Sequence, residues 1–285
     1  MKFYKVGIVM RRKRNRRFRL ILLISFSFLF LFLSSSYAIL SENLEVVGQA
    51  TISSHVSSGG DFVGGVSDEE DGLVENEDGS SNFVGDSGTT VNNFIQMPGD
   101  SYFWRILSID VDGNLKIIRN RDESLSMAFI SSGGNARDWA NTLILQNLKS
   151  WYQENLGGYS NIIVQNPEWL VTDAAKPGTV VNVLGTYTDS PIGLIRNDEI
   201  VNSSSTGASG QNVSSWLNDG YIWTMTYVNK GNKTDRAWRV NGDKFMDSAA
   251  INAGSTVARP VIYLKSSVMF SSGTGTESDP FVVKY

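Results

Sequence analysis

A strongly basic N-terminus that runs straight into an apolar segment is the feature that most restricts what this chain can fold into. Residues 1–19 carry nine Lys and Arg side chains and no acid, and residues 20–33 are apolar except for two serines. Ser36, Tyr37 and Ala38 then form a small-x-small site. These are the parts of a secretory signal in their usual order. We therefore predict that residues 1–38 are a signal peptide cleaved after Ala38, and that the rest folds outside the cytoplasm.

The same segment has a second interpretation, as a retained signal anchor. A membrane-spanning helix needs about 20 apolar residues, and the run at 20–33 has fourteen, which favours cleavage. An uncleaved anchor would keep its basic end in the cytoplasm and would be the protein's contact with a membrane. In both cases we expect a secreted or cell-surface protein that is exported across the cytoplasmic membrane.

Removal of the signal changes the charge of the chain sharply. The nine basic residues leave with it, so that 16 Lys and Arg remain against 29 Asp and Glu, and the net charge becomes −13. Phosphate groups repel a protein of this charge. We therefore expect no nucleic-acid partner.

The chain contains no cysteine and a single histidine, His55. Disulfides, thiolate metal sites and cysteine nucleophiles are excluded, so the fold depends on its core alone. His55 lies at the edge of a polar segment, which excludes a Ser-His-Asp triad or a histidine zinc site inside the folded part. A carboxylate pair of the glycosidase kind remains to be considered. The candidate acids are Asp198, Glu199, Asp219 and Asp235. Acids beside Asn and Gly more often form helix caps and turns, so we predict no enzymatic activity.

Residues 39–90 have the composition of a linker. The sequence LEVVGQATIS at 44–53 predicts one short strand. Residues 57–90 are mostly Ser, Gly, Asp and Glu, and no Lys or Arg occurs between residues 39 and 104. Low hydrophobicity combined with charge of one sign cannot offset the loss of chain entropy on folding. We predict an acidic, Ser/Gly-rich disordered linker that holds the remaining chain away from the cell surface.

Residues 91–285 are long enough for one globular domain. Strands are predicted at 103–109 and 115–119, joined by the turn at Asp112, Gly113 and Asn114. Apolar residues at helical spacing predict a helix at 137–156, ended by Gly157 and Gly158 as a glycine cap. A second, short helix is expected from residue 197, with Asp198 as a possible cap. Residues 169–172 are expected to form a short strand or a turn, and the remaining strands are expected at 192–196, 221–226, 237–240, 261–264 and 281–283. This pattern indicates an α+β domain with short irregular strands, one or two helices and long loops.

Several of these segments, in this order, resemble an uncharacterised family of exported bacterial domains. That family is related in fold to C-type lectins and, distantly, to the formylglycine-generating enzyme group. The matching segments are WRIL at 104–107, DGNLKI at 112–117, LKSWY at 148–152, IGLI at 192–195, YIWTM at 221–225, RPVIYLK at 259–265 and DPFVV at 279–283. The resemblance implies a C-type-lectin-like fold and says little about function, because one fold hosts many functions. Residues 36–53 are similar to the signal junction of bacterial surface-fibre and exported matrix proteins.

The resemblance suggests two kinds of chemistry, and each requires particular residues in this chain. The formylglycine-generating enzymes use cysteine thiols, and this chain has none, so that activity is not expected here. Calcium-dependent lectins bind sugar near a Trp-Asn-Asp segment, and Trp216, Asn218 and Asp219 are superficially similar. The alternative is that Trp216 packs in the core and Asn218 and Asp219 form a turn, which we favour. No cofactor is expected, and calcium is the ion to test.

Aromatic side chains can also stack on sugars or anchor a partner. Of the seven tryptophans, Trp216 and Trp238 stand beside polar loops and are predicted to be the most exposed. The speculative ligand-binding set is therefore Trp216, Asn218, Asp219 and Trp238. We expect an exported, non-catalytic binding protein that recognises an extracellular glycan or protein. The alternatives are a structural subunit of a surface fibre or matrix and a cell-wall glycan hydrolase.

Overall fold

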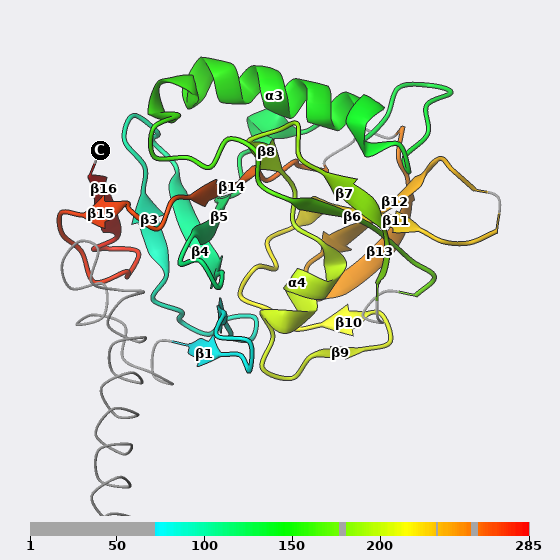
Figure 1. Ribbon diagram of the computed structural model, residues 1–285. Coiled ribbons are helices and arrows are strands. Elements are labelled where there is room, and N and C mark those ends of the chain that lie inside the picture. The colour runs from blue at the N-terminus through cyan, green and yellow to red at the C-terminus, as the bar shows by residue number, and fades with distance from the viewer. Residues whose placement is uncertain (1–71, 177–180, 232, 252–255, 285) are drawn as a thin grey trace, which may run out of the picture. The chain divides into compact units, whose positions relative to one another are not determined.

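The computed structural model describes residues 72–176, 181–231, 233–251 and 256–284 (Figure 1). The predicted signal at 1–38 with Ala38, the strand at 44–53, His55 and the linker as far as residue 71 lie outside the described residues. The described chain is a mixed α+β structure, mostly β-sheet, with two α-helices. The α+β prediction is therefore confirmed at this level.

The first sheet has nine strands, of which seven follow one another in the order β15-β16-β3-β4-β5-β14-β8. Strand β2 also pairs with β4 and carries β1 with it. Strand β16 runs parallel to β3, and the other pairs are antiparallel. The strands are β1 (Leu73–Glu75), β2 (Ser81–Phe83), β3 (Phe94–Gln96), β4 (Phe103–Ile109), β5 (Leu115–Arg119), β8 (Ile192–Gly193), β14 (Val261–Leu264), β15 (Met269–Phe270) and β16 (Phe281–Lys284).

The second sheet has seven strands in the order β7-β6-β11-β12-β13-β10-β9. Strand β6 runs parallel to β11, and the other pairs are antiparallel. Its strands are β6 (Trp169–Ala174), β7 (Asn182–Tyr187), β9 (Ala208–Ser209), β10 (Asn212–Val213), β11 (Tyr221–Val228), β12 (Arg236–Asn241) and β13 (Lys244–Ala249). Strand β7 ends this sheet on one side and β9 on the other.

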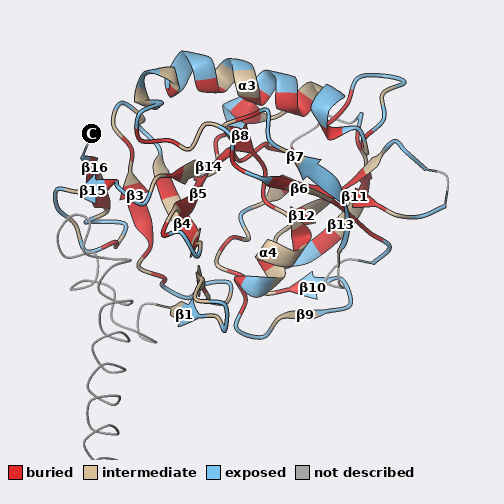
Figure 2. Ribbon diagram, viewed as in Figure 1, coloured by how far each residue is buried: buried red, intermediate tan, exposed pale blue. Residues whose placement is uncertain are grey.

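Trp169 packs the second sheet against the first. Its ring lies edge-on to Tyr263 of β14, with 5.4 Å between ring centroids, and its Nε1 donates to the carbonyl of Ser190 at 2.8 Å. Gly193 of β8 makes this approach feasible, because a Cβ at that position would come within 2.7 Å of the Trp169 ring. The buried residues of both sheets form one continuous core (Figure 2).

Helix α3 (Leu143–Asn155) covers the other face of the first sheet (Figure 1). Its Trp151 lies against Trp104 of β4, with 6.4 Å between ring centroids. The helix is shorter than predicted, because Thr142 caps it by accepting from the N–H of Leu145 and the preceding turn is a 3₁₀ helix. The glycine cap is also wrong: residues 157–159 form another 3₁₀ turn after the helix.

Helix α4 (Asn197–Asn202) is the predicted second helix. Its N-cap is Arg196 rather than Asp198, and the side chain of Glu199 accepts from the Arg196 N–H at 2.9 Å. Neither described α-helix has the length and apolar character that crossing a membrane requires.

Within residues 72–90, which were predicted to belong to a disordered linker, the structure has two strands of the first sheet, β1 and β2. Strands β1 and β2 form a hairpin, and β2 pairs with β4 through Ser81 opposite Ile109 and Asn82 opposite Ser108. The reason is that this acidic segment still contains a strong apolar anchor, since Phe83 is fully buried. Burial of one aromatic side chain contributes roughly 2–3 kcal/mol to the free energy of folding. The average composition of a segment does not reveal such a single contribution.

Candidate functional site

The four residues predicted for ligand binding do not form one site. Trp238 lies in β12, between β11 and β13, and is fully buried. Its Nε1 donates to the carbonyl of Ala174 at 3.0 Å. The prediction of an exposed Trp238 is therefore wrong, because Trp238 lies with Val240 on a face of β12 that packs into the core.

The connection between β10 and β11 contains Trp216, Asn218 and Asp219. Their contacts are with other parts of the protein and stabilise the fold. The Nε1 of Trp216 donates to the carbonyl of Phe83 at 2.9 Å, and the Arg105 guanidinium lies 4.4 Å from the centre of its ring. Asn218 donates to the carbonyl of Val213 at 2.7 Å. Asp219 is exposed, and its carbonyl accepts from Arg121. This is the packing and turn arrangement that we weighed against a lectin-like site.

Calcium, the ion to test, is held in proteins by several oxygen ligands, among which carboxylates are prominent. Among the residues that the structure describes, no group of three or more His, Cys, Asp or Glu side chains could hold a metal ion. Asn218 Nδ2 donates to a carboxylate oxygen of Asp243 at 2.9 Å, so its amide is engaged in fixing the turn.

A polar pocket of about 320 Å³ lies elsewhere, between the β1–β2 hairpin, β4 and helix α4. In Figure 1 the hairpin, in cyan, lies beneath the end of β4 and beside α4. We call this the hairpin–helix pocket. It is lined by Asn76, Asp78, Ser80, Asn82, Leu107, Ser108, Arg196, Glu199, Asn202 and Ser203.

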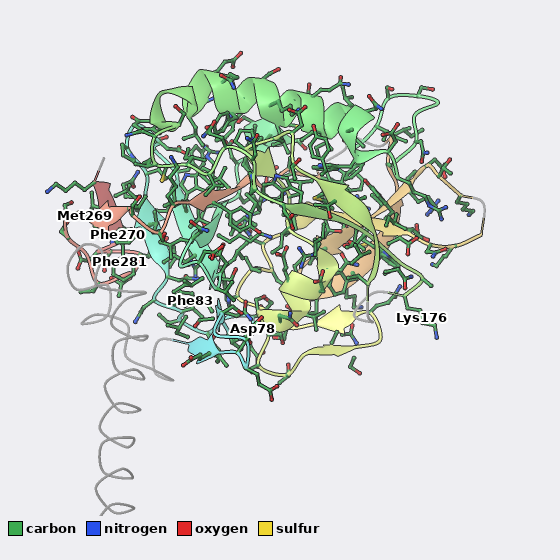
Figure 3. The ribbon with its side chains drawn as sticks, in the orientation of Figure 1. Asp78, Phe83, Lys176, Met269, Phe270 and Phe281 are labelled. Atoms are coloured by element: carbon green, nitrogen blue, oxygen red, sulfur yellow. The ribbon has the colours of Figure 1, made fainter. Side chains whose placement is uncertain are left out.

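The hairpin supplies one wall through side chains that fix each other. Asn76 Nδ2 donates to Ser80 Oγ at 2.9 Å. Asp78, which is labelled in Figure 3, accepts from both the backbone N–H and the hydroxyl of Ser80, at 3.0 and 2.6 Å. These hydrogen bonds lower the pKa of Asp78, so its carboxylate is charged at neutral pH. The wall therefore presents amide, hydroxyl and carboxylate oxygens in a fixed arrangement.

A β-bulge in β4 brings that strand into the pocket. Ile106 pairs with Ile117 and Ser108 pairs with Lys116, so Leu107 is the extra residue. A bulge redirects the side chains of a strand and is common next to functional sites. Here the extra residue, Leu107, and the residue that follows it, Ser108, both line the pocket.

Glu199, which lines the pocket, belongs to a buried ion pair. Lys116 of β5 has a 3% exposed side chain and donates to Glu199 of α4, whose side chain is 17% exposed. The Lys116 ammonium also lies 5.1 Å from the centre of the Tyr263 ring and 5.5 Å from that of Trp169. A buried cation of this kind is stabilised by its partner carboxylate and by the faces of the two rings.

Arg196 extends the pair into a network of four charges. Its guanidinium contacts Asp198 at 2.8 Å and Glu199 at 3.4 Å. Burial alone would raise the pKa of Glu199, but the charges of Arg196 and Lys116 outweigh it and lower the pKa to about 2. Two cations and two carboxylates therefore balance one another, and Asp78 adds one negative charge at the wall.

The carboxylates of the pocket are suited to accepting hydrogen bonds rather than to donating protons. A glycosidase needs one carboxylic acid whose pKa is raised, whereas the pKa values of Asp78 and Glu199 are both lowered. Of the other three acids considered for catalysis, Asp198 is paired with Arg196, Asp219 lies on the β10–β11 connection and Asp235 is exposed before β12. The four acids thus do not form an acid–base pair.

The sequence did not predict this pocket, because four of its ten lining residues, Asn76, Asp78, Ser80 and Asn82, lie in the segment that was predicted to be a disordered linker. No protein family, curated protein or solved structure matches this chain.

Proposed function

We propose that this protein is an exported recognition protein that binds an extracellular glycan in the hairpin–helix pocket. The observation that carries the proposal is the lining of the pocket, where amide, hydroxyl and carboxylate groups surround a balanced set of buried charges. Sugars offer many hydroxyl groups, each of which both donates and accepts, and this lining offers both kinds of partner. A protein ligand at the same surface is the alternative.

The binding role fits the expected location of the chain. The basic and apolar N-terminus predicts export. After cleavage the protein has a net charge of −13, which repels anionic ligands, so we expect a polar pocket on it to bind an uncharged ligand. The C-type-lectin-like fold suggested by the resemblance is part of this proposal. The sugar site that we propose differs from the Trp-Asn-Asp position of calcium-dependent lectins.

A glycan array probed with the exported protein tests the proposal. The blocking variant is Asn202→Trp, because Asn202 is exposed, lies at the last residue of α4 and lines the pocket. The matched control is Asn155→Trp, which makes the same change at an exposed Asn in the last residue of α3. We expect the wild type and Asn155→Trp to bind the same neutral glycans and Asn202→Trp to bind none of them. Equal binding by both variants, or no glycan bound at micromolar protein, would contradict the proposal.

A further inference from the structure

The β1–β2 hairpin has a loosely held tip, residues 73–82, which we call the hairpin tip. None of these residues is buried, and of the two apolar side chains Leu73 is partly buried against the core and Val74 is 45% exposed. Among the described strands, β1 pairs with β2 alone, over three residue pairs, and β2 pairs with β4 over two. A two-stranded hairpin is at best marginally stable in water by itself. The tip therefore depends on its short pairing with β4 for its position.

The polar side chains of the tip contact one another. Within the described part of the chain, the side-chain hydrogen bonds of Asn76, Asp78 and Ser80 join these three residues to each other. The turn is closed in the same way, because the N–H of Asn76 donates to the carbonyl of Ser80 at 2.7 Å. The tip also carries three carboxylates and no basic residue. These contacts hold the shape of the tip and do not attach it to the rest of the domain.

The residues that follow the tip are firmly attached. Phe83 is fully buried, and its carbonyl accepts from Trp216 Nε1 at 2.9 Å. The N–H of Gly85 donates to the carbonyl of Ser203 at 2.9 Å, and the carbonyl of Gly85 accepts from the N–H of Trp216 at 3.1 Å. Figure 3 labels Phe83 in this segment and Asp78 in the tip. The chain thus passes from a fixed base into a peripheral tip, which is the arrangement of a hinged lid.

The tip supplies one wall of the hairpin–helix pocket. Four of the ten lining residues belong to it, and the other six lie in β4, in α4 or next to α4. A ligand that contacts both walls binds the protein with a docked tip better than the protein with an undocked tip. Binding of such a ligand therefore shifts the tip toward the docked state.

We propose that the hairpin tip is a lid of the hairpin–helix pocket, which opens while the rest of the domain stays folded and closes on the bound ligand. The closing rests on the proposed function, because it requires a ligand in the pocket, whereas the opening does not. Closure shields the hydrogen bonds of the ligand from water, which strengthens them. The opening of the tip then sets how fast the ligand enters and leaves.

Hydrogen exchange of the sugar-free exported protein tests the opening. The hydrogen-bonded amides of β2 are compared with those of Ile117 and Ile118 in β5, a strand that is paired on both sides. We expect the β2 amides to be protected at least about 100-fold less, because the tip opens without global unfolding. Equal protection of β2 and β5 would overturn the proposal, since the tip would then open only when the domain unfolds.

A disulfide between β2 and β4 provides the matched control. Ser81 lies opposite Ile109, and neither residue lines the pocket. Opposed residues of an antiparallel pair have Cα atoms about 4.5–5.5 Å apart, which suits a disulfide, and the chain has no cysteine of its own. We expect the oxidised variant Ser81→Cys/Ile109→Cys to protect its β2 amides at least about tenfold more than the reduced form. The same protection in both forms would contradict an opening tip.

Sugar binding tests the closing. Glucose, galactose, mannose and N-acetylglucosamine are each added to the exported protein. For a sugar at about ten times its dissociation constant, we expect the protection of the β2 amides to rise about elevenfold, because opening must release the sugar. The oxidised variant should bind and release that sugar at least about tenfold more slowly than the reduced form.

Two outcomes of the sugar experiment have different meanings. Unchanged protection of β2 with a saturating sugar would overturn the lid, because binding would not depend on the tip. Failure of all four sugars to bind would contradict the proposed function instead, and exchange of the sugar-free protein would still decide whether the tip opens.

Discussion

Replacement of Glu199 by Gln tests the buried charge network that joins Lys116, Arg196 and Glu199, the last two of which line the hairpin–helix pocket. The substitution keeps the size of the side chain and removes its charge, which leaves Lys116 buried without its carboxylate partner. Loss of one member of a buried pair typically costs 3–5 kcal/mol, because an uncompensated charge remains in a medium of low dielectric constant. We therefore expect Glu199→Gln to lower the free energy of unfolding substantially at pH 7.

The magnitude follows from the pKa of Glu199. The pKa lies at about 2 in the folded protein against 4.5 for an unperturbed side chain. At about 1.4 kcal/mol per pKa unit, this difference corresponds to roughly 3 kcal/mol of stabilisation at neutral pH. Because the folded pKa is the lower one, the stabilisation is fully present above about pH 5. It is lost as the pH falls from the unfolded value of 4.5 toward 2.

Urea unfolding at a series of pH values measures this effect. The wild type should be more stable than Glu199→Gln by roughly 3 kcal/mol at pH 7, and the two should converge between pH 4.5 and pH 2. The control is Glu154→Gln, which removes a charge from an exposed position of α3 and should change stability by less than about 0.5 kcal/mol. A difference below about 1 kcal/mol at pH 7, or one that persists unchanged at low pH, would refute the reasoning.

Two further predictions concern the packing of the second sheet against the first. Trp238→Ala should lower the free energy of unfolding by roughly 3–5 kcal/mol, because it leaves a cavity where a fully buried side chain was packed. Denaturant unfolding measures this change. A loss below about 1 kcal/mol would show that Trp238 is exposed in solution. Gly193→Ala should cost about 1–3 kcal/mol by forcing its Cβ against Trp169. The control Gly185→Ala, whose Cβ meets open space, should stay within about 0.5 kcal/mol of the wild type in thermal unfolding. Equal effects of the two glycine substitutions would contradict the observed packing.

The parts of the fold that sequence predicted correctly are those set by local signals. The strand at 103–109 and its partner at 115–119 have the predicted bounds, because apolar alternation and the Asp112-Gly113-Asn114 turn lie within one hairpin. Helix α3 was also predicted, since its buried side chains recur at helical spacing. The exact start of α3 was not predicted, because the 3₁₀ turn before the helix places the apolar residue Trp139 where it continues the helical spacing.

The missed elements depend on contacts between distant parts of the chain. Strands β1 and β2 are held by pairing with β4 and by the burial of Phe83, while their composition is that of a linker. Strand β7 has no apolar alternation, because most of its residues are exposed. Strand β13 was also missed; it follows β12 through a tight turn and pairs with it antiparallel.

The hairpin–helix pocket was not predicted for the same reason. Trp216, Asn218 and Asp219 matched a short motif, and short motifs are weak evidence without their structural context. The pocket instead combines the hairpin with α4, which are separated by more than a hundred residues of sequence. The sequence did single out Glu199 as a carboxylate of interest, but its pairing with Lys116 of β5 follows only from the fold.

A chemical-shift titration tests the central claim, glycan binding in the hairpin–helix pocket, most directly. The isotope-labelled exported protein would be titrated with glucose, galactose, mannose and N-acetylglucosamine, and the backbone amide signals followed. We expect saturable shifts at Asn82, Ser108 and Asn202, which line the pocket, and unchanged signals at Asn218 and Asp219. Shifts confined to Asn218 and Asp219, or no saturable shift with any of the four sugars, would contradict the account.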